Sequence, residues 1–178
     1  MLKLVGFDAD DTLWHSEGFY REVHGHFERI LGQYIDIGNA VVHDHLLEVE
    51  RANIKLFGYG AKGMTLSMLE TAVALTSERI SARHLHEIIQ LGKEALTHPV
   101  ELIAGIPEAV AEVAREFQVV LITKGDLFHQ ESKVARSGLS SLFGRIEIVP
   151  EKAPATHRRE RAECGLPAGQ LLRARTSL

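Results

Sequence analysis

Two acidic residues, Asp8 and Asp10, stand two positions apart where an apolar run, residues 2–7, gives way to a polar cluster. Such a run is typical of a buried β-strand. Because side chains of an extended backbone alternate in direction, we expect Asp8 and Asp10 to converge on one side and Asp11 to point away. Two adjacent carboxylates repel unless a cation or a shared proton relieves the repulsion, which favours a metal-assisted site at the end of the strand. The same residues also suit a turn followed by a helix cap, since Asp and Thr12 are common in both.

The composition indicates a folded chain with no general attraction to nucleic acid or membranes. Its 178 residues are 45% hydrophobic and carry a net charge of −4. This suffices for one core, or a core with a small accessory domain, and is not basic enough for a nucleic-acid or anionic-membrane surface. The single cysteine, Cys164, cannot form an internal disulfide, which fits a reducing compartment. No run approaches the ~20 apolar residues of a membrane span, and residues 1–7 are too short for a signal peptide. We therefore expect a cytoplasmic protein.

Periodicity divides the chain into a helical part and a part that alternates between helix and strand. Residues 14–99 carry apolar residues at three- and four-residue steps and are expected to form an all-helical domain. Residues 1–13 and 100–178 are expected to form one discontinuous α/β domain, since alternating helices and strands pair in parallel. The expected helices are 15–31, 40–57, 66–75 and 81–96 in the first part and 106–117, 128–142 and 155–164 in the second, and the expected strands are 2–7, 119–122 and 146–149.

The first polar cluster resembles a known phosphatase motif. An apolar strand followed by Asp, any residue, Asp, any residue, Thr and Leu, here Asp8 to Leu13, is similar to the first signature of the haloacid dehalogenase superfamily. The resemblance implies a Rossmann-like parallel sheet with an inserted helical cap. It also implies that Asp8 is a nucleophile forming an aspartyl-phosphate, that Asp10 is the general acid and base, and that Thr12 orients the turn. The second Asp resembles the phosphatases more than the haloacid dehalogenases themselves.

Two later segments resemble the second and third signatures of the same superfamily. An apolar strand ends in Thr123, Lys124 and Gly125, and the resemblance assigns Thr123 to a phosphoryl oxygen. Gly125 permits close approach, so that backbone N–H groups around Lys124 and Gly125 can bind the anion. By itself this segment would also serve as an ordinary strand-to-helix turn. Lys152 resembles the third-signature lysine, which would neutralise carboxylate and phosphate charge. We favour it over Lys133, which lies within an expected helix and is interpreted as a solvated side chain.

The resemblance also implies a Mg²⁺ cofactor, but the acidic residues of the fourth signature are absent from residues 170–178. Leu171 and Leu172 suit the start of its strand. Asp8 and the carbonyl of Asp10 supply two protein ligands to an ion that prefers six oxygens, so weak metal affinity is expected. We interpret the tail from about Leu172 as a frameshifted or truncated end of a longer phosphatase, which would leave a sheet edge uncovered.

The sequence thus predicts a magnesium-dependent phosphatase of a small phosphorylated metabolite. The expected protein partner is a second copy of the chain, bound through the helical domain or the uncovered sheet edge. A non-catalytic remnant of the fold, with at most weak phosphate or protein binding, is the alternative. Haloacid hydrolysis without magnesium is a third interpretation, and Asp10 counts against it.

Two further patterns are interpreted as structural. Residues 58–63 match GxGxxG, but no clear strand precedes them, so we expect a loop between helices and not a dinucleotide site. Histidine pairs two residues apart, among them His24 with His26 and His43 with His45, diverge on a helix and are expected on a solvated surface.

Overall fold

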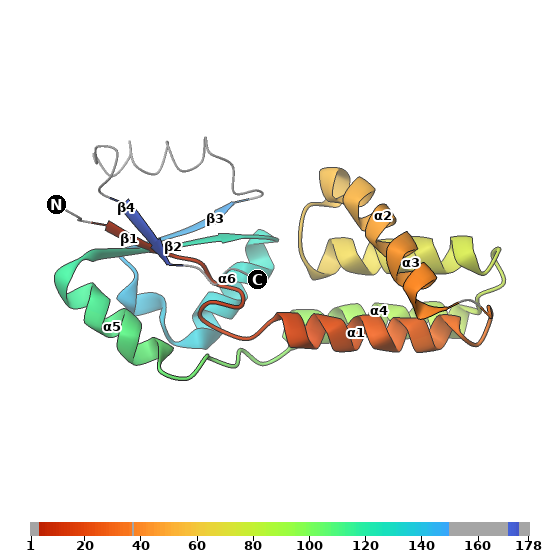
Figure 1. Ribbon diagram of the computed structural model, residues 1–178, viewed down its shortest axis with the longest axis horizontal. Helices are drawn as coiled ribbons and strands as arrows, with labels where there is room; N and C mark the ends of the chain where they lie inside the picture. The colour runs from red at the N-terminus through yellow and green to blue at the C-terminus, as the bar shows by residue number, and fades with distance from the viewer. Residues whose placement is uncertain (1–3, 37, 150–170, 175–178) are drawn as a thin grey trace. The chain divides into compact units, whose positions relative to one another are not determined.

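The computed structural model describes residues 4–36, 38–149 and 171–174. The chain divides into two compact units, which we call the sheet unit, Met1–Ser16 with Pro99–Leu178, and the helical unit, Glu17–His98 (Figure 1). Trp14 is 1% exposed within the core of the sheet unit and forms a β-bridge with Leu102. The first junction therefore follows Ser16 and not Leu13, where the periodicity had placed it.

The described residues of the sheet unit form four parallel strands. β1 (Leu4–Phe7) pairs with β2 (Gln118–Lys124) on one side and with β4 (Leu171–Ala174) on the other, and β3 (Arg145–Val149) pairs with β2, giving the order β3-β2-β1-β4. All of β1 is buried, as is the interior of β2. Strands buried on both faces require the near-continuous apolar runs seen in the sequence. The predicted parallel α/β architecture is confirmed.

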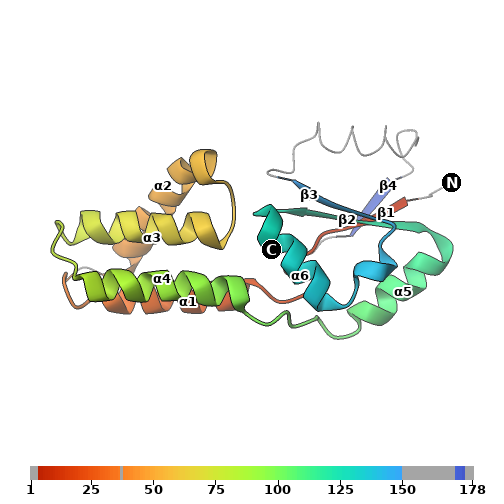
Figure 2. The ribbon, with the colours of Figure 1, turned by 180° about the vertical axis from the view of Figure 1, so that it is seen from behind.

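Helices α5 (Ile106–Glu116) and α6 (Leu127–Ser137) lie on the same side of this sheet, with a short 3₁₀ helix, η1 (Ser140–Leu142) (Figures 1 and 2). Successive side chains of β2 point to opposite faces of the sheet. Val119 and Leu121 pack in the core that includes residues of α5 and α6, whereas Val120 packs with Leu4 and Ile122 in a second cluster.

Two glycines set the ends of these helices. Gly105 has a φ of +81° just before α5, and Pro107 occupies the first turn. Gly138 has a φ of +72° and ends α6 at Ser137. The left-handed backbone at Gly138 interrupts the helix, so the predicted helix 128–142 is in fact α6 followed by η1.

Four helices make up the helical unit, and they surround a core of their own. They are α1 (Glu17–Leu31), α2 (Asn39–Phe57), α3 (Ala61–Leu75) and α4 (Ala82–Thr97). Ser81 caps α4 as predicted, its Oγ accepting a bond from the His84 N–H at 3.2 Å. The largest fully buried side chains of this core are Phe27, Ile30, Leu31, Leu46, Met68 and Ile88.

The glycine-rich segment joins α2 to α3. Gly58, with a φ of +74°, ends α2, and Gly60, with a φ of +114°, precedes α3. α3 begins at Ala61 and not at Leu66 as predicted. Gly63 fits inside it where a Cβ would lie 2.8 Å from the Gly58 carbonyl oxygen. A helix and not a strand precedes this segment, so it lacks the context of a dinucleotide-binding turn.

His24 departs from the expected solvated surface. Its side chain is 20% exposed, and its buried Nε2 has no hydrogen-bond partner among the described residues. Burial first, and then the neighbouring His43, lower the pKa of His24. His43 itself is exposed, and His26 lies 3.2 Å from the Glu87 carboxylate. The surface interpretation thus fits His43 and is wrong for His24.

Part of the chain lies outside the described residues. This part holds Lys152, Cys164 and the predicted helix 155–164. Among the helices that the structure does describe, none has the length and apolar character to cross a membrane.

Gly92 makes the contact between α3 and α4 testable. A Cβ added to this buried glycine would lie 2.0 Å from Thr65 Oγ1 and 2.8 Å from Thr65 Cγ2. We expect Gly92→Ala to lower the free energy of unfolding by about 1–3 kcal/mol through overpacking, measured by urea denaturation. Gly18→Ala on exposed helical backbone, where nothing lies within 4 Å, is the matched control and should be neutral or slightly stabilising. Addition of Thr65→Ala should recover part of the loss, and additive effects would contradict the proposed clash.

Candidate active site

The sequence-predicted site residues lie at the carboxyl ends of two neighbouring strands. β1 and β2 run parallel with Phe7 opposite Leu121, so that Asp8 follows one strand where Thr123 and Lys124 finish the other. Ligands of open α/β sheets bind at this edge. The parallel pairing therefore brings the first and second polar clusters to the same edge, although they are far apart in the sequence.

A tight turn after β1 reverses the chain and gives the first cluster its shape. The N–H groups of Thr12 and Leu13 donate to the Ala9 carbonyl at 3.1 and 2.8 Å, and the Asp11 N–H donates to the Trp14 carbonyl at 2.8 Å. Asp11 has a φ of +55°, a left-handed conformation that Asp tolerates better than most residues. Thr12 is 8% exposed within this turn, and its orienting role remains a prediction of the resemblance. The turn returns the chain to a position beside Asp10.

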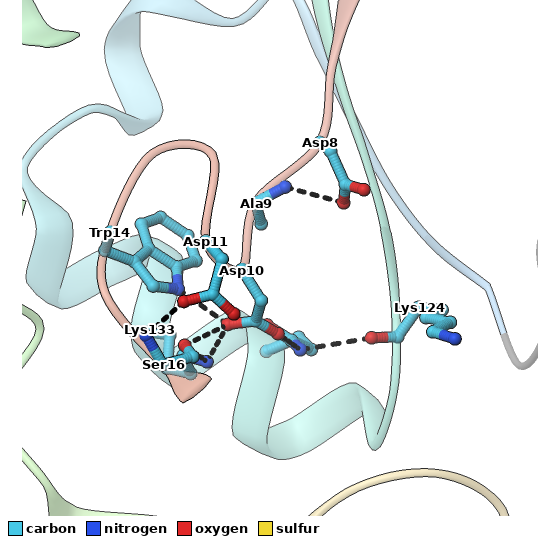
Figure 3. A network of polar contacts seen from close by, with 9 residues as sticks. Asp8, Ala9, Asp10, Asp11, Trp14, Ser16, Lys124 and Lys133 are labelled. Carbon is cyan, nitrogen blue, oxygen red and sulfur yellow. Dashed lines mark hydrogen bonds and ion pairs between the residues drawn. The ribbon is translucent and has the colours of Figure 1, made fainter. Parts of the chain in front are cut away.

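The Asp10 carboxylate is the centre of a polar network (Figure 3). Its Oδ1 accepts bonds from Trp14 Nε1 at 2.8 Å, from Ser16 Oγ at 2.7 Å and from Lys133 Nζ. Its Oδ2 accepts a bond from Gln130 Nε2 at 2.8 Å. Two of these donors come from the turn and two from α6, so the carboxylate is held from both sides.

Asp8 and Asp11 lie differently from the expected alternation. Asp8 Oδ1 accepts a bond from the Ala9 N–H at 2.8 Å, and Figure 3 shows Asp8 apart from the Asp10 network. Asp11 was expected to point away, but its Oδ1 accepts a bond from the Ser16 N–H at 2.8 Å, next to the Ser16 hydroxyl that binds Asp10. The reason is that the backbone leaves the extended conformation at the turn, where the two-residue alternation no longer applies.

The pKa of Asp10 reflects this network. Burial raises it, but the charge of Lys133 and the hydrogen bonds from Lys133, Ser16 and Gln130 together lower it from 3.8 to about 2. Asp10 is therefore a carboxylate at neutral pH in this arrangement.

Lys133 was interpreted from the sequence as a solvated side chain, and this is wrong. It is 7% exposed and forms an ion pair with Asp10. Its Nζ also donates to Ser16 Oγ at 3.2 Å and lies 5.5 Å from the centre of the Trp14 ring. A position within a helix does not by itself expose a lysine, because exposure depends on the face of the helix on which the side chain lies.

A signal for this face was present in the sequence. Gln130, Lys133 and Ser137 are buried along one side of α6 together with Val134, whereas Leu127 and Phe128 are exposed. Polar residues at the helical spacing of a buried stripe require polar partners inside the protein. Gln130, Ser16 and Trp14 are the site residues that sequence reasoning missed.

The turn after β2 combines a buried hydroxyl with a constrained glycine. Thr123 is 1% exposed, and Lys124 is exposed. Gly125 has a φ of +143°, and a Cβ there would lie 3.0 Å from Gln130 Nε2. The Gly125 N–H, predicted to donate to an anion, donates in the structure to the Val149 carbonyl at 3.2 Å. The predicted anion contact of the Gly125 N–H therefore does not fit this structure, whereas the predicted roles of Thr123 and Lys124 remain predictions.

Asp126 completes the same turn as the cap of α6. Its carboxylate accepts a bond from the His129 N–H at 2.9 Å. The segment is thus also the strand-to-helix turn that the sequence allowed, and the two interpretations are compatible.

A magnesium ion would find an incomplete protein ligand set here. No group of three or more His, Cys, Asp or Glu residues suited to a metal occurs among the described residues. Mg²⁺ commonly keeps several waters and takes one or two carboxylates together with substrate phosphate. The carboxylate of Asp8 and the carbonyl of Asp10 are oxygen donors of the kind that such a more open mode of binding would need.

Comparisons with known proteins confirm the family that the sequence resembles. The family model for haloacid dehalogenase-like hydrolases matches residues 2–165. A crystal structure of a haloacid dehalogenase-like hydrolase from Xanthomonas campestris shares 56% identity with a TM-score of 0.94, over 99% of this chain and 74% of that one. None of the curated proteins matches the chain.

More distant structures share the fold with different activities. A 2-haloacid dehalogenase from Pseudomonas syringae pv. tomato is 16% identical with a TM-score of 0.62, over 97% of this chain and 77% of that one. A predicted phosphoglycolate phosphatase from Haemophilus somnus is 18% identical with a TM-score of 0.59, over 97% and 76%. At these identities the likeness concerns the fold, and the reaction has to be argued from the site.

Gly125 offers a first test of the site geometry. We expect Gly125→Ala to lower the free energy of unfolding by about 1–3 kcal/mol, because a Cβ at this φ is strained and contacts Gln130. Gly144→Ala is the control in the same unit, since that residue is exposed and its nearest neighbour would lie 3.7 Å away. Equal stability of the two variants in urea denaturation would contradict the described turn.

The pKa of Asp10 predicts a dependence of stability on pH. Because the folded pKa, about 2, lies below the usual 3.8, the charged carboxylate stabilises the fold above roughly pH 4 and this contribution is lost as the pH falls toward 2. The difference in unfolding free energy between the wild type and Asp10→Asn should therefore shrink over that interval. A difference that stays constant from pH 6 to pH 2 would contradict the ion pair with Lys133.

Proposed function

Because the chain belongs to the haloacid dehalogenase-like hydrolase family, we propose that it is a phosphatase that hydrolyses a small phosphate monoester through an aspartyl-phosphate on Asp8. The observation that carries the proposal is the network around Asp10. A halide leaves as a stable anion and needs no proton, whereas an alkoxide leaving from phosphorus does. A second carboxylate held two residues from the nucleophile suits the ester.

The first half of the reaction transfers the phosphoryl group to the protein. A carboxylate oxygen of Asp8 attacks phosphorus, the bond from phosphorus to the ester oxygen breaks, and that oxygen takes the proton of Asp10. Asp10 must be protonated for this step. A phosphate dianion bound beside Asp10 would favour this form, because a like charge disfavours the ionised carboxylate.

The second half restores the protein. The Asp10 carboxylate takes a proton from water, the resulting hydroxide attacks phosphorus, and the bond from phosphorus to the Asp8 oxygen breaks to give inorganic phosphate. This step begins from the Asp10 carboxylate, the form that accepts hydrogen bonds from Lys133 and Gln130 in the structure.

Three side chains are proposed to bind the phosphate. The Thr123 hydroxyl would donate to a phosphoryl oxygen, and Lys124 would supply positive charge at the same turn. Lys152 would supply a further cation, as its resemblance to the family lysine implies. Ser16 and Trp14 are engaged with Asp10 and have no proposed contact with substrate.

We further propose that the reaction depends on Mg²⁺, held by the carboxylate of Asp8 and the carbonyl of Asp10. The ion would offset the negative charge that develops on the phosphoryl oxygens. With so few protein ligands its affinity is expected to be weak, so millimolar concentrations would be needed.

Hydrolysis of 4-nitrophenyl phosphate tests the proposal. With excess MgCl₂ the wild type should release 4-nitrophenol, Asp8→Asn should fall to the rate without enzyme, and removal of Mg²⁺ with EDTA should abolish turnover. Asp44→Asn, which changes an exposed carboxylate of α2, is the matched control and should retain the wild-type rate. Equal release by the wild type and Asp8→Asn would refute the phosphatase and leave a binding protein. Halide release from 2-chloropropionate without Mg²⁺ would instead indicate a dehalogenase.

A further inference from the structure

We propose that Gln130 and Lys133 of α6 are positioning residues that hold the Asp10 carboxylate in one orientation. Their side chains donate to Asp10, to the Ser16 hydroxyl and to the Lys124 carbonyl, and in our proposal they do not contact the phosphate. Their catalytic effect rests on the proposed phosphatase function, in which Asp10 must face the leaving oxygen. Their effect on the orientation of Asp10 does not depend on it.

The two side chains take hold of different oxygens of the carboxylate. Lys133 Nζ donates to Oδ1 and Gln130 Nε2 donates to Oδ2 at 2.8 Å. A carboxylate bonded at only one oxygen can turn about its Cβ–Cγ bond, whereas bonds at both oxygens from one rigid element prevent that rotation. Residues three apart in sequence lie on the same face of a helix, which lets α6 present both donors together.

Gln130 also ties Asp10 to the turn after β2. Its Nε2 donates to the Lys124 carbonyl at 3.1 Å as well as to Asp10. A Cβ at Gly125 would lie 3.0 Å from this amide nitrogen, so a side chain there would displace the amide. One amide group thus fixes the position of Asp10 relative to the turn that carries Thr123 and Lys124, the residues proposed to bind phosphate.

The burial of Gln130 argues against a role in packing alone. Its side chain is 5% exposed, and within the described part of the chain its Oε1 has no hydrogen-bond partner. A buried oxygen without a partner is destabilising, and an apolar residue of the same length would avoid this. The amide at this position is therefore best explained by its N–H groups, which donate hydrogen bonds to Asp10 and to the Lys124 carbonyl.

The chemistry of the leaving group can separate positioning from packing. Phenyl phosphate and 4-nitrophenyl phosphate have similar sizes, but phenolate is the poorer leaving group and depends more on a proton from Asp10. Gln130→Met, which keeps the length of the side chain and removes its N–H groups, should lower kcat about tenfold more for phenyl phosphate than for 4-nitrophenyl phosphate. Its KM values should stay within about twofold of the wild type, because no substrate contact is lost.

Lys133→Met also removes the charge that lowers the pKa of Asp10, so its effect on the orientation of Asp10 is judged by the Trp14 indole signal described below, which it should move. Arg136→Met, which removes an exposed cation on the same helix, should behave like the wild type on both esters. Gln130→Leu also removes the N–H groups without adding a charge, and it takes the place of Gln130→Met if that variant fails to fold. An equal fall in kcat on both esters would overturn the proposal, since a loss of packing has no reason to follow the leaving group.

A second readout works whether or not the chain turns over an ester. Trp14 is the only tryptophan in the sequence, and its indole N–H donates to Asp10 at 2.8 Å. The single indole cross-peak of a ¹H–¹⁵N spectrum therefore reports on Asp10. It should move in Asp10→Asn, move in Gln130→Met, and stay in place in Arg136→Met.

The two readouts separate the two hypotheses. If the wild type and Asp8→Asn are equally inactive, the phosphatase function fails and the indole signal alone decides whether Gln130 holds Asp10. An indole signal that moves in Asp10→Asn but coincides with the wild type in Gln130→Met would overturn the positioning role.

Discussion

The parallel pairing of β1 with β2 is the constraint on which the rest of the molecule depends. Leu4 lies opposite Gln118. The first strand therefore pairs with a segment that is separated from it by more than half of the chain. The segments entering and leaving the helical unit are themselves joined, since the His15 N–H donates to the Glu101 carbonyl at 2.9 Å and the Ile103 N–H donates to the Leu13 carbonyl at 3.0 Å. The insertion thus begins and ends at neighbouring points and can fold around its own core without disturbing the sheet. Closing so long a loop adds little to the entropic cost of folding, because the loss of chain entropy grows only with the logarithm of the loop length.

The same pairing explains why a buried charge is tolerated beside the strand end. Lys133 lies in the sheet unit with little exposure, and an isolated ammonium there would be unstable. Asp10 and Ser16 supply its acceptors, and both belong to the turn that β1 delivers to this edge. A buried ion pair rarely adds much to stability over apolar packing. What the pair does define is a single geometry, because the loss of either partner would leave the other buried and unpaired.

The fold could be predicted further from the sequence than the site could. Parallel strands and amphipathic helices are local patterns, and the strand at 119–122, the cap at Ser81 and the helical insertion follow from period and composition alone. Gly138 illustrates the limit, since whether a glycine ends a helix or continues it depends on the backbone conformation that packing selects. The network around Asp10 depends on which face of α6 meets the sheet. Lys133 was misjudged for that reason, although Gln130, Lys133 and Ser137 already formed a polar stripe at helical spacing.

The commitment of Lys133 to Asp10 changes the roles of the cations at this edge. The sequence made Lys133 and Lys152 rivals for one task, the neutralisation of phosphate. The Lys133 ammonium already donates hydrogen bonds to Asp10 and Ser16, which leaves it few N–H groups for a phosphoryl oxygen. The two lysines therefore have different roles. Lys133 balances the carboxylate that would move the proton, and the charge of the substrate must be balanced by other cations. In the proposed reaction these are Lys124, Lys152 and the metal ion. Of the three, Lys124 is the one that the structure describes, at the end of β2 beside the buried Thr123 hydroxyl.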